Sequence, residues 1–275
     1  MDPQAIAADP AVGSGWFARD MTMTGTGDLP LSNWRVLVTR PAEQADSLLE
    51  ALRQAGATPV AYPTIGLEAP PSWAPFDAAI GRVASFDWIV FCSPSAVRFA
   101  LGRAPQLEAL LRLSPAPAVA AVGDETARRL NQYGIPVALV PQDQRQEGLV
   151  AAFGDRLPAG TRVLFPQTIG GREHLREALC GAGAIVEVVP VSRTVGLPLD
   201  APPPPFDAVI FASPSAVKAF VAKLTVAALR DKVVAVMGAT TRDAAVAAGV
   251  GVHVVPAAPS VVALVDALGA YRAGS

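Results

Sequence analysis

The sequence predicts an α/β protein made of two similar flavodoxin-like lobes, each with a parallel sheet flanked by helices. Short strands alternate with helical segments along the chain, which is the pattern of mainly parallel sheets covered on both faces. Segments of the chain recur in the same order, which indicates an internal duplication. Two proline-rich stretches, residues 69–76 and 201–206, interrupt the pattern at equivalent places in the two copies.

The duplication rests on three pairs of matching segments. Phe86–Arg98 (FDWIVFCSPSAVR) matches Phe206–Lys218 (FDAVIFASPSAVK) at eight of thirteen positions. The other pairs are Val36–Glu68 with Val163–Val195, and Val119–Pro141 with Val234–Pro256. One such match can arise by chance in an alanine-rich chain, but three in the same order indicate two copies of one unit.

Each copy reads as strand–helix–strand, then strand–helix, then strand–helix–strand–helix. The predicted strands are β-branched runs, such as VLVT, WIVF, VAAV and VALV in the first copy and AVIF, VVAVM and VHVV in the second. The helices carry apolar residues three and four positions apart, as at Leu48, Leu49 and Leu52. Right-handed crossovers between parallel strands give a doubly wound order. The proline-rich stretches are either passages between lobes or surface loops, and the sequence leaves both open.

The bulk composition excludes several classes of protein. The length of 275 residues suits two domains, and no apolar run is long enough to span a bilayer. No basic region precedes an apolar run near residue 1, so we expect no secretory signal. Two cysteines suggest no disulfide framework, and the net charge of −2 lacks the basic footprint of a nucleic-acid binder. We expect a cytoplasmic globular protein without nucleic-acid or membrane partners.

Residues 1–33 lack hydrophobic periodicity. They are predicted to be a disordered extension, or partly an upstream start ahead of Met21 or Met23.

Four predicted strand-to-helix turns are suited to binding anions. Two contain Ser-Pro-Ser-Ala (Ser93–Ala96 and Ser213–Ala216), and two contain a glycine followed by hydroxyl residues (Gly123–Thr126 and Gly238–Thr241). Free backbone N–H groups and the helix dipole attract carboxylate or phosphate at such turns. Each turn alone is adequately explained as a helix cap, and Asp124 and Glu125 weaken the third as an anion site. Four turns in paired copies together favour a polyanion site.

Basic side chains near the predicted strand ends can surround that site. They are Arg40, Arg172 and Arg193 and, one turn into the repeated helices, Arg98 and Lys218. Singly each is an ordinary surface charge, but as a set they offer charge-assisted hydrogen bonds to carboxylates.

Motifs for cofactors, metals and activated nucleophiles are missing. The chain has no G-x-G-x-x-G, Walker A, G-x-S-x-G or paired-cysteine metal spacing, so no cofactor and no metal are expected. We interpret His174, His253 and Cys92 as structural residues. An enzyme of this kind would act mainly by holding a reactive substrate in one geometry.

Val36–Leu268 resembles the uroporphyrinogen-III synthase family. The resemblance is carried by V-L-V-T-R-P-x-x-Q-A (Val36–Ala45), the paired F-x-S-P-S-A-V segments, G-G-R-E-x-L (Gly170–Leu175), the G-A-T-T turn, and P-S-V-x-x-L-V-x-A-L (Pro259–Leu268). Each motif is weak alone, and their order across a duplicated chain is more specific. The resemblance implies two lobes joined by a two-stranded ladder. It assigns residues 34–60 and 197–272 to a discontinuous first lobe, 69–185 to the second, and 61–68 and 186–196 to the linker strands.

The resemblance also implies an activity, that of a cyclising hydro-lyase in tetrapyrrole (haem, sirohaem, cobalamin and chlorophyll) biosynthesis. The family closes the linear tetrapyrrole hydroxymethylbilane to uroporphyrinogen III, with loss of water and inversion of ring D through a spiro intermediate. This substrate bears eight carboxylates, which suits the anion-binding turns. A monomer is expected, with hydroxymethylbilane synthase as a transient protein contact.

The predicted substrate-binding residues belong to the turns or are basic neighbours: Arg40, Ser93, Ser95, Thr126, Arg172, Ser213, Ser215, Gly238, Thr240 and Thr241. No catalytic residue is assigned firmly, and Thr240 and Thr241 are candidates. Family members commonly carry a Tyr in the second linker strand, where this chain has Ser192. This departure keeps open a non-catalytic or regulatory relative that binds a tetrapyrrole or another polyanion. An unrelated two-lobed protein of periplasmic type is disfavoured because no signal sequence is visible.

Overall fold

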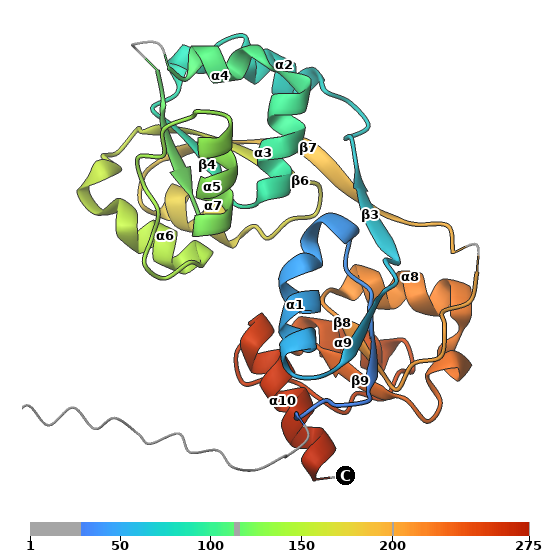
Figure 1. Cartoon of the computed structure of the whole chain (residues 1–275). Coiled ribbons are helices and arrows are strands. Elements are labelled where there is room, and N and C mark those ends of the chain that lie inside the picture. The colour runs from blue at the N-terminus through green and yellow to red at the C-terminus, as the bar shows by residue number, and fades with distance from the viewer. Residues whose placement is uncertain (1–28, 113–115, 200, 275) are drawn as a thin grey trace, which may run out of the picture.

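The chain folds around two separate β-sheets (Figure 1). The computed structural model describes residues 29–112, 116–199 and 201–274. The first sheet has the spatial order β2 (Thr58–Ala61), β1 (Arg35–Val38), β8 (Ala208–Phe211) and β9 (Val233–Val236). The second has the order β3 (Ile65–Glu68), β7 (Ile185–Gly196), β6 (Arg162–Thr168), β4 (Trp88–Phe91) and β5 (Ala118–Ala121). Among these strands, only β3 and β7 pair in antiparallel fashion.

Helices cover both faces of the first sheet, and we call the whole the first-sheet unit. One face packs against α1 (Asp46–Gln54) and α10 (Val261–Ala273), the other against α8 (Pro214–Leu224) and α9 (Ala239–Ala247). Val36 and Val38 of β1 pack with α1, whereas Leu37 packs with α8, because successive side chains of a strand face opposite ways. Two 3-10 helices, η1 (Ala42–Gln44) and η4 (Val226–Leu229), complete this unit.

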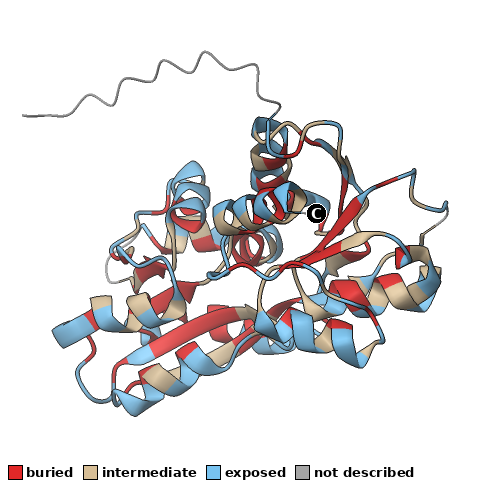
Figure 2. Cartoon of the chain, turned by 90° about the horizontal axis from the view of Figure 1, so that it is seen from below, coloured by how far each residue is buried: buried red, intermediate tan, exposed pale blue. Residues whose placement is uncertain are grey.

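The second sheet is covered in the same way, and we call it the second-sheet unit. One face packs against α2 (Ala74–Ile80), α3 (Pro94–Arg103), α4 (Gln106–Leu110) and α5 (Asp124–Gln132), with η2 (Val83–Ser85) beside them. The other face packs against α6 (Gln146–Phe153) and α7 (His174–Gly181), with η3 (Gly154–Arg156) between them in the chain. Figure 2 shows the buried strands lying between helices that expose their outer faces. The predicted class of parallel sheets flanked by helices is confirmed.

The two sequence repeats are exchanged between the sheets. β1 and β2 come from the first repeat, yet β1 pairs with β8 of the second repeat, with Val36 opposite Ala208. In the second sheet β6 and β7 take the places of β1 and β2, and β4 and β5 take those of β8 and β9. The order β2-β1-β8-β9 follows the flavodoxin-like pattern, and a single bridge from Ala235 to Val254 extends it.

The two units are joined by a short antiparallel ladder. Ile65 pairs with Gly196, and Glu68 pairs with Arg193. β7 is longer than this ladder, because its first part, up to Ser192, runs parallel to β6 inside the second sheet. The proline-rich stretches follow the ladder strands. The first leads from the ladder strand β3 into α2 of the second-sheet unit, and the second leads from the ladder strand β7 into β8 of the first-sheet unit, so each connects the ladder to a unit.

Three expectations require correction. The predicted strands VALV and VHVV are reduced to single bridges at Leu139 and Val254, because they lie at sheet edges with one neighbour. The predicted extension at residues 1–33 falls largely outside the described residues, but its end is ordered. Leu31 is fully buried in the core beside α1, and its N–H donates to the Ala55 carbonyl at 2.8 Å.

Candidate functional site

A cavity of about 450 Å³, which we call the main cavity, lies between the two units. The first-sheet unit contributes the segment after β1 and the N-terminus of α8, and the ladder contributes residues of β3 and β7. The second-sheet unit contributes the N-termini of α3 and α6 and the loop after β6. Its lining residues are Arg40, Pro41, Gln44, Ile65, Leu67, Ser93, Gln146, Thr168, Gly171, Arg172, Thr194, Ala212, Ser213, Ser215 and Ala216.

The two Ser-Pro turns meet at this cavity, one from each unit. Ser93 caps α3, and its Oγ accepts a hydrogen bond from the Ala96 N–H at 3.1 Å. Ser213 caps α8 in the same way, with its Oγ accepting from the Ala216 N–H at 3.3 Å. Each hydroxyl used as an acceptor keeps its own proton for donation. The two helix N-termini therefore direct positive dipole ends and hydroxyl donors into the same cavity.

Two arginines bring full positive charge to the main cavity. Arg40 follows β1 and is half-buried, and this burial lowers the pKa of its guanidinium while the carboxylate of Glu125 acts in the opposite direction. Arg172 is exposed on the loop after β6. Within the described residues it makes no side-chain hydrogen bond or ion pair, so its donors are available to a ligand. Arginine is charged at any physiological pH and binds carboxylates in bidentate fashion.

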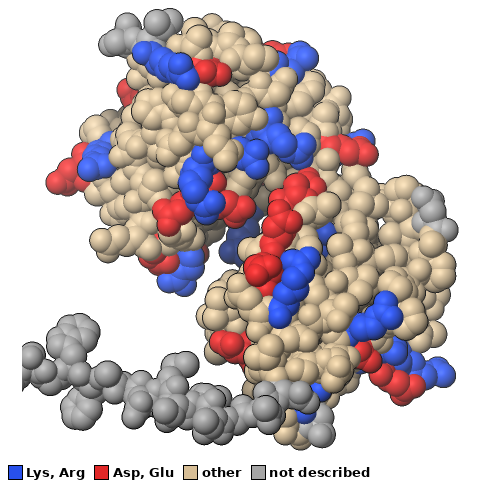
Figure 3. All heavy atoms as spheres, in the orientation of Figure 1, with Lys and Arg blue, Asp and Glu red and all other residues tan. Residues whose placement is uncertain are grey.

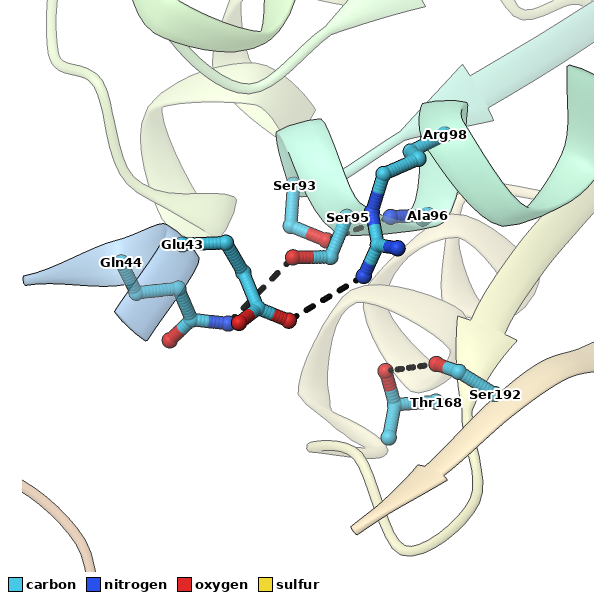
Figure 4. Close-up of polar contacts among 8 residues, drawn as sticks. All are labelled: Glu43, Gln44, Ser93, Ser95, Ala96, Arg98, Thr168 and Ser192. Carbon is cyan, nitrogen blue, oxygen red and sulfur yellow. Dashed lines mark hydrogen bonds and ion pairs between the residues drawn. The ribbon is translucent and has the colours of Figure 1, made fainter. Parts of the chain in front are cut away.

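A smaller cavity of about 160 Å³ adjoins the main one and shares Arg40, Gln44 and Ser93 with it. Two side-chain contacts connect the units here, and we call them the clasp (Figure 4). Glu43 of η1 forms an ion pair with Arg98 of α3 at 3.1 Å, and Gln44 Nε2 donates to Ser95 Oγ at 3.3 Å. Ser95 is thus buried against the opposite unit, whereas its repeat counterpart Ser215 is exposed and lines the main cavity.

The family Tyr position does not face the main cavity in this chain. Ser192 is fully buried, and its Oγ lies 2.7 Å from Thr168 Oγ1 (Figure 4). The hydroxyl that lines the cavity belongs to Thr168, at the end of β6. A register shift between Gln167 and Thr168 sets the end of β6 against Ser192. Ser192, the residue at the family Tyr position, thus does not line the main cavity, whereas its hydrogen-bond partner Thr168 does.

The predicted substrate-binding residues of the second pair of turns line neither cavity, although Glu125 of the Gly123–Thr126 turn lines the smaller one. Thr126 and Thr241 are buried, Gly238 is half-buried, and Thr240 is exposed away from the main cavity. The Gly123 turn is closed by its own chain, since the Asp124 N–H donates to Gln144 Oε1 at 3.1 Å. The structure thus brings together five of the ten predicted substrate-binding residues, and a sixth lines the adjoining cavity: Arg40, Ser93, Arg172, Ser213 and Ser215, then Ser95.

The residues interpreted as structural lie outside the main cavity. The His253 Nδ1 accepts a hydrogen bond from the Val234 N–H at 3.0 Å, and His174 lies 3.6 Å from Glu147. Burial raises the pKa of the Cys92 thiol to about 12. Arg193 pairs with Glu68 across the ladder at 3.2 Å. In the described parts of the chain no group of three or more His, Cys, Asp or Glu side chains is placed to hold a metal ion.

Sequence reasoning missed four polar residues of the main cavity: Gln44, Gln146, Thr168 and Thr194. The Gln44 position was visible only as part of the V-L-V-T-R-P-x-x-Q-A motif. Thr168 had a usable signal, because a hydroxyl residue at the carboxyl end of a parallel strand lies at the ligand-binding edge. No motif or strand-end position in the sequence pointed to Gln146 or Thr194.

A larger cavity of about 580 Å³ lies beside α2, α3 and α4, away from the carboxyl ends of the strands. Its charges are already neutralised, since Arg103 pairs with Asp77 at 2.6 Å and Arg82 pairs with Glu187 at 2.6 Å. We therefore take the main cavity as the candidate functional site. Figure 3 shows acidic and basic side chains along the facing edges of the two units, with basic atoms deep in the gap. No helix in the described residues is long and apolar enough to cross a membrane.

Comparison with solved structures supports the fold. A uroporphyrinogen III synthase variant from Thermus thermophilus superposes with a TM-score of 0.51 at 18% identity, covering 88% of this chain and all of that chain (100%). The uroporphyrinogen-III synthetase of Helicobacter pylori gives a TM-score of 0.57 at 17% identity, covering 85% of this chain and 97% of that one. At these identities the likeness concerns the fold.

Comparison of sequences identifies the family. A protein of Synechococcus elongatus named uroporphyrinogen-III synthase is 38% identical over 162 residues, which is 58% of this chain and 61% of that protein. A Methanothermobacter thermautotrophicus protein named putative uroporphyrinogen-III synthase is 30% identical over 191 residues, which is 66% of this chain and 74% of its own length. The profile of the family described as uroporphyrinogen-III synthase HemD matches residues 46–266. The chain therefore belongs to the uroporphyrinogen-III synthase family.

Proposed function

We propose that this chain is a uroporphyrinogen-III synthase that closes hydroxymethylbilane to uroporphyrinogen III in the main cavity. The observation that carries the proposal is the meeting of two repeated Ser-Pro helix N-termini with Arg40 and Arg172 around one cavity. This set offers donors to several carboxylates at once, which suits a substrate that bears eight. Substrate binding residues are thus Arg40, Ser93, Arg172, Ser213 and Ser215.

The site favours geometric selection over acid–base chemistry. Among the described residues that line the main cavity there is no carboxylate, His or Tyr. The substrate reacts spontaneously once its hydroxide departs, so the protein needs to fix the conformation in which ring D is attacked at its substituted carbon. The substrate's own carboxylates, held at the helix N-termini, offset the positive charge that develops on the chain of pyrroles. The Thr168 hydroxyl donates a hydrogen bond to the departing hydroxide and keeps its proton, and the proton that the substrate loses on ring closure completes the water.

The lobe boundaries are part of the same proposal. We assign residues 34–60 and 197–272 to one lobe and 69–185 to the other, with 61–68 and 186–196 as linker. Support comes from the exchange of strands between the sheets and from the antiparallel pairing of β3 with β7. We also propose a monomer in the cytoplasm. The two free cysteines, of which Cys180 is exposed, support a reducing compartment.

A non-catalytic binder is the second candidate, and the burial of Ser192 favours it. One assay separates the two. The protein is incubated with hydroxymethylbilane made in situ, the products are oxidised, and the isomers are resolved by chromatography. A synthase gives mainly isomer III, faster than the spontaneous reaction. Isomer I alone, at the spontaneous rate, would contradict the proposed activity.

A substitution at Arg172 tests the proposed binding site with the same assay. We expect Arg172→Met to raise the KM for hydroxymethylbilane about tenfold or more, because a charge-assisted contact is lost. Arg176→Met is the matched control, since Arg176 is an exposed arginine on α7 that pairs with Glu173 and does not line the main cavity. Equal KM values in the two variants would show that Arg172 does not bind the substrate.

A further inference from the structure

Gln146 carries an unused hydrogen-bond acceptor at the main cavity. It is the first residue of α6 and one of the residues that line this cavity. Its Oε1 is buried and has no hydrogen-bond partner, and it is the one such side-chain atom among the described residues. Buried polar side-chain atoms are nearly always paired, so an unpaired one at a cavity points to a missing ligand.

The neighbouring polar groups explain why this acceptor stands out. Arg40 and Arg172 can only donate, and the helix N-termini of α3 and α8 likewise present N–H groups. One amide N–H of Gln44 already donates to Ser95, and the Ser and Thr hydroxyls that line the cavity can donate or accept. A ligand that consisted only of carboxylates would satisfy the donors and leave Gln146 Oε1 unpaired. The unpaired Oε1 therefore favours a ligand that also brings a donor.

We propose that Gln146 is a positioning residue that accepts a hydrogen bond from a pyrrole N–H of the tetrapyrrole. This inference rests on the proposed function for the identity of the ligand. A linear tetrapyrrole bears acceptors on its edges and N–H donors along its centre, which matches the donors around the cavity and the unpaired neutral acceptor of Gln146. The terminal torsion of a glutamine side chain is broad, so the amide turns easily toward a donor that enters the cavity.

A hydrogen bond to a pyrrole N–H fixes the orientation of the ring, which carboxylate binding alone does not. Carboxylates on flexible arms fix the edges of a pyrrole ring loosely, whereas an N–H bond fixes the plane and the direction in which that ring faces. A neutral acceptor serves this purpose better than a carboxylate side chain, which would repel the anionic substrate. The interaction is the same before and during ring closure, so it contributes to binding more than to the chemical step.

The test uses the full-length protein with Gln146→Met, a substitution that keeps the length of the side chain and removes the acceptor. Gln142→Met is the matched control, because Gln142 is exposed and lies outside the main cavity. We expect Gln146→Met to raise the KM about tenfold with kcat little changed. Its melting temperature should equal or exceed that of the parent, since an unpaired buried carbonyl is removed. The control variant should change neither quantity.

Direct binding separates this inference from the proposed activity. The affinities of both variants are measured under anaerobic conditions for uroporphyrinogen III, whose tilting pyrrole rings can present N–H groups, and for benzenehexacarboxylate, which bears carboxylates alone. The inference predicts weaker uroporphyrinogen binding by Gln146→Met and unchanged benzenehexacarboxylate binding. If the parent protein bound uroporphyrinogen without producing isomer III, the proposed activity would be refuted, and the affinities would still test the role of Gln146. Unchanged uroporphyrinogen affinity, equal losses for both ligands, or a lowered melting temperature would each overturn the inference.

Discussion

The hydroxyls of Thr168 and Ser192 lie 2.7 Å apart, but only Thr168 lines the main cavity. We expect Thr168→Val to lower kcat/KM by about tenfold or more, because the cavity loses a donor and the buried Ser192 hydroxyl loses its partner. Thr168→Ser keeps the hydroxyl and should retain most of the activity. Steady-state kinetics with hydroxymethylbilane provide the measurement. If valine and serine at this position behaved alike, the Thr168 hydroxyl would have no part in the reaction.

The same pair of residues shows what a sequence can reveal about this site. The Ser-Pro turns were predictable because a capping serine followed by proline has a recognisable pattern, and both turns line the main cavity. Thr168 was not predicted, since a strand pattern does not reveal a register shift that buries the Ser192 hydroxyl and leaves Thr168 at the cavity. Gln146 could not be predicted, because its significance comes from an unpaired atom.

The two cysteines differ sharply in their surroundings. Burial raises the pKa of Cys92 to about 12, whereas Cys180 is exposed on α7. Only the thiolate reacts with alkylating reagents. We therefore expect iodoacetamide at pH 8 to modify Cys180 and to leave Cys92 intact in the folded protein, as peptide mass spectrometry would show. Rapid modification of Cys92 would mean that the strand end beside Ser93 opens in solution.

At the scale of elements, the clasp between η1 and α3 joins the two units by two side-chain contacts beside the main cavity. An exposed ion pair such as Glu43–Arg98 contributes only about 0.2–1 kcal/mol, so the clasp is weak enough for a substrate to displace. We expect Glu43→Arg to increase the radius of gyration of the free protein in small-angle scattering, because like charges then face each other. Combining it with Arg98→Glu should restore the original value.

The matched control for the clasp is an ion pair within one helix. Glu173→Arg with Arg176→Glu reverses a pair at the start of α7 that joins no two units, and it should leave the radius of gyration unchanged. If Glu43→Arg behaved like this control, the contact would not restrain the units. The two units must move apart to admit the proposed substrate. The main cavity of about 450 Å³ lies toward the lower end of small-molecule cavities, and a tetrapyrrole is a large ligand.

Strands that are fully buried could be predicted from the sequence, and strands at the edges of the sheets were harder to predict. β8 is an uninterrupted apolar run with all four residues buried, as expected for a parallel strand covered on both faces. The segment after α1 was harder, because it divides into β2 and β3 around Pro63 and the two strands serve different sheets. Pairing partners, which decide such cases, are not encoded in local patterns.

For the whole molecule, the exchange of strands separates the repeats in sequence from the cores in space. Both hydrophobic cores of the second-sheet unit are made of residues between Phe76 and Val191. The second sequence repeat, by contrast, contains β6 and β7 from one sheet and β8 and β9 from the other. Cutting the chain by repeats thus divides cores, whereas cutting it at the ladder preserves them.

This difference predicts which fragment folds. We expect residues 69–196, expressed alone, to show native-like circular dichroism and a single cooperative transition in urea, because every buried contact of its two cores is retained. Residues 142–275 should not, since Leu164 and Phe165 of β6 lose the neighbouring strand β4 that completes their sheet. A cooperative transition in residues 142–275 would show that β6 does not need β4 to fold. The absence of one in residues 69–196 would show that the units depend on each other for stability. In that event the weak clasp and the four-pair ladder would be a poor measure of how strongly the two units interact.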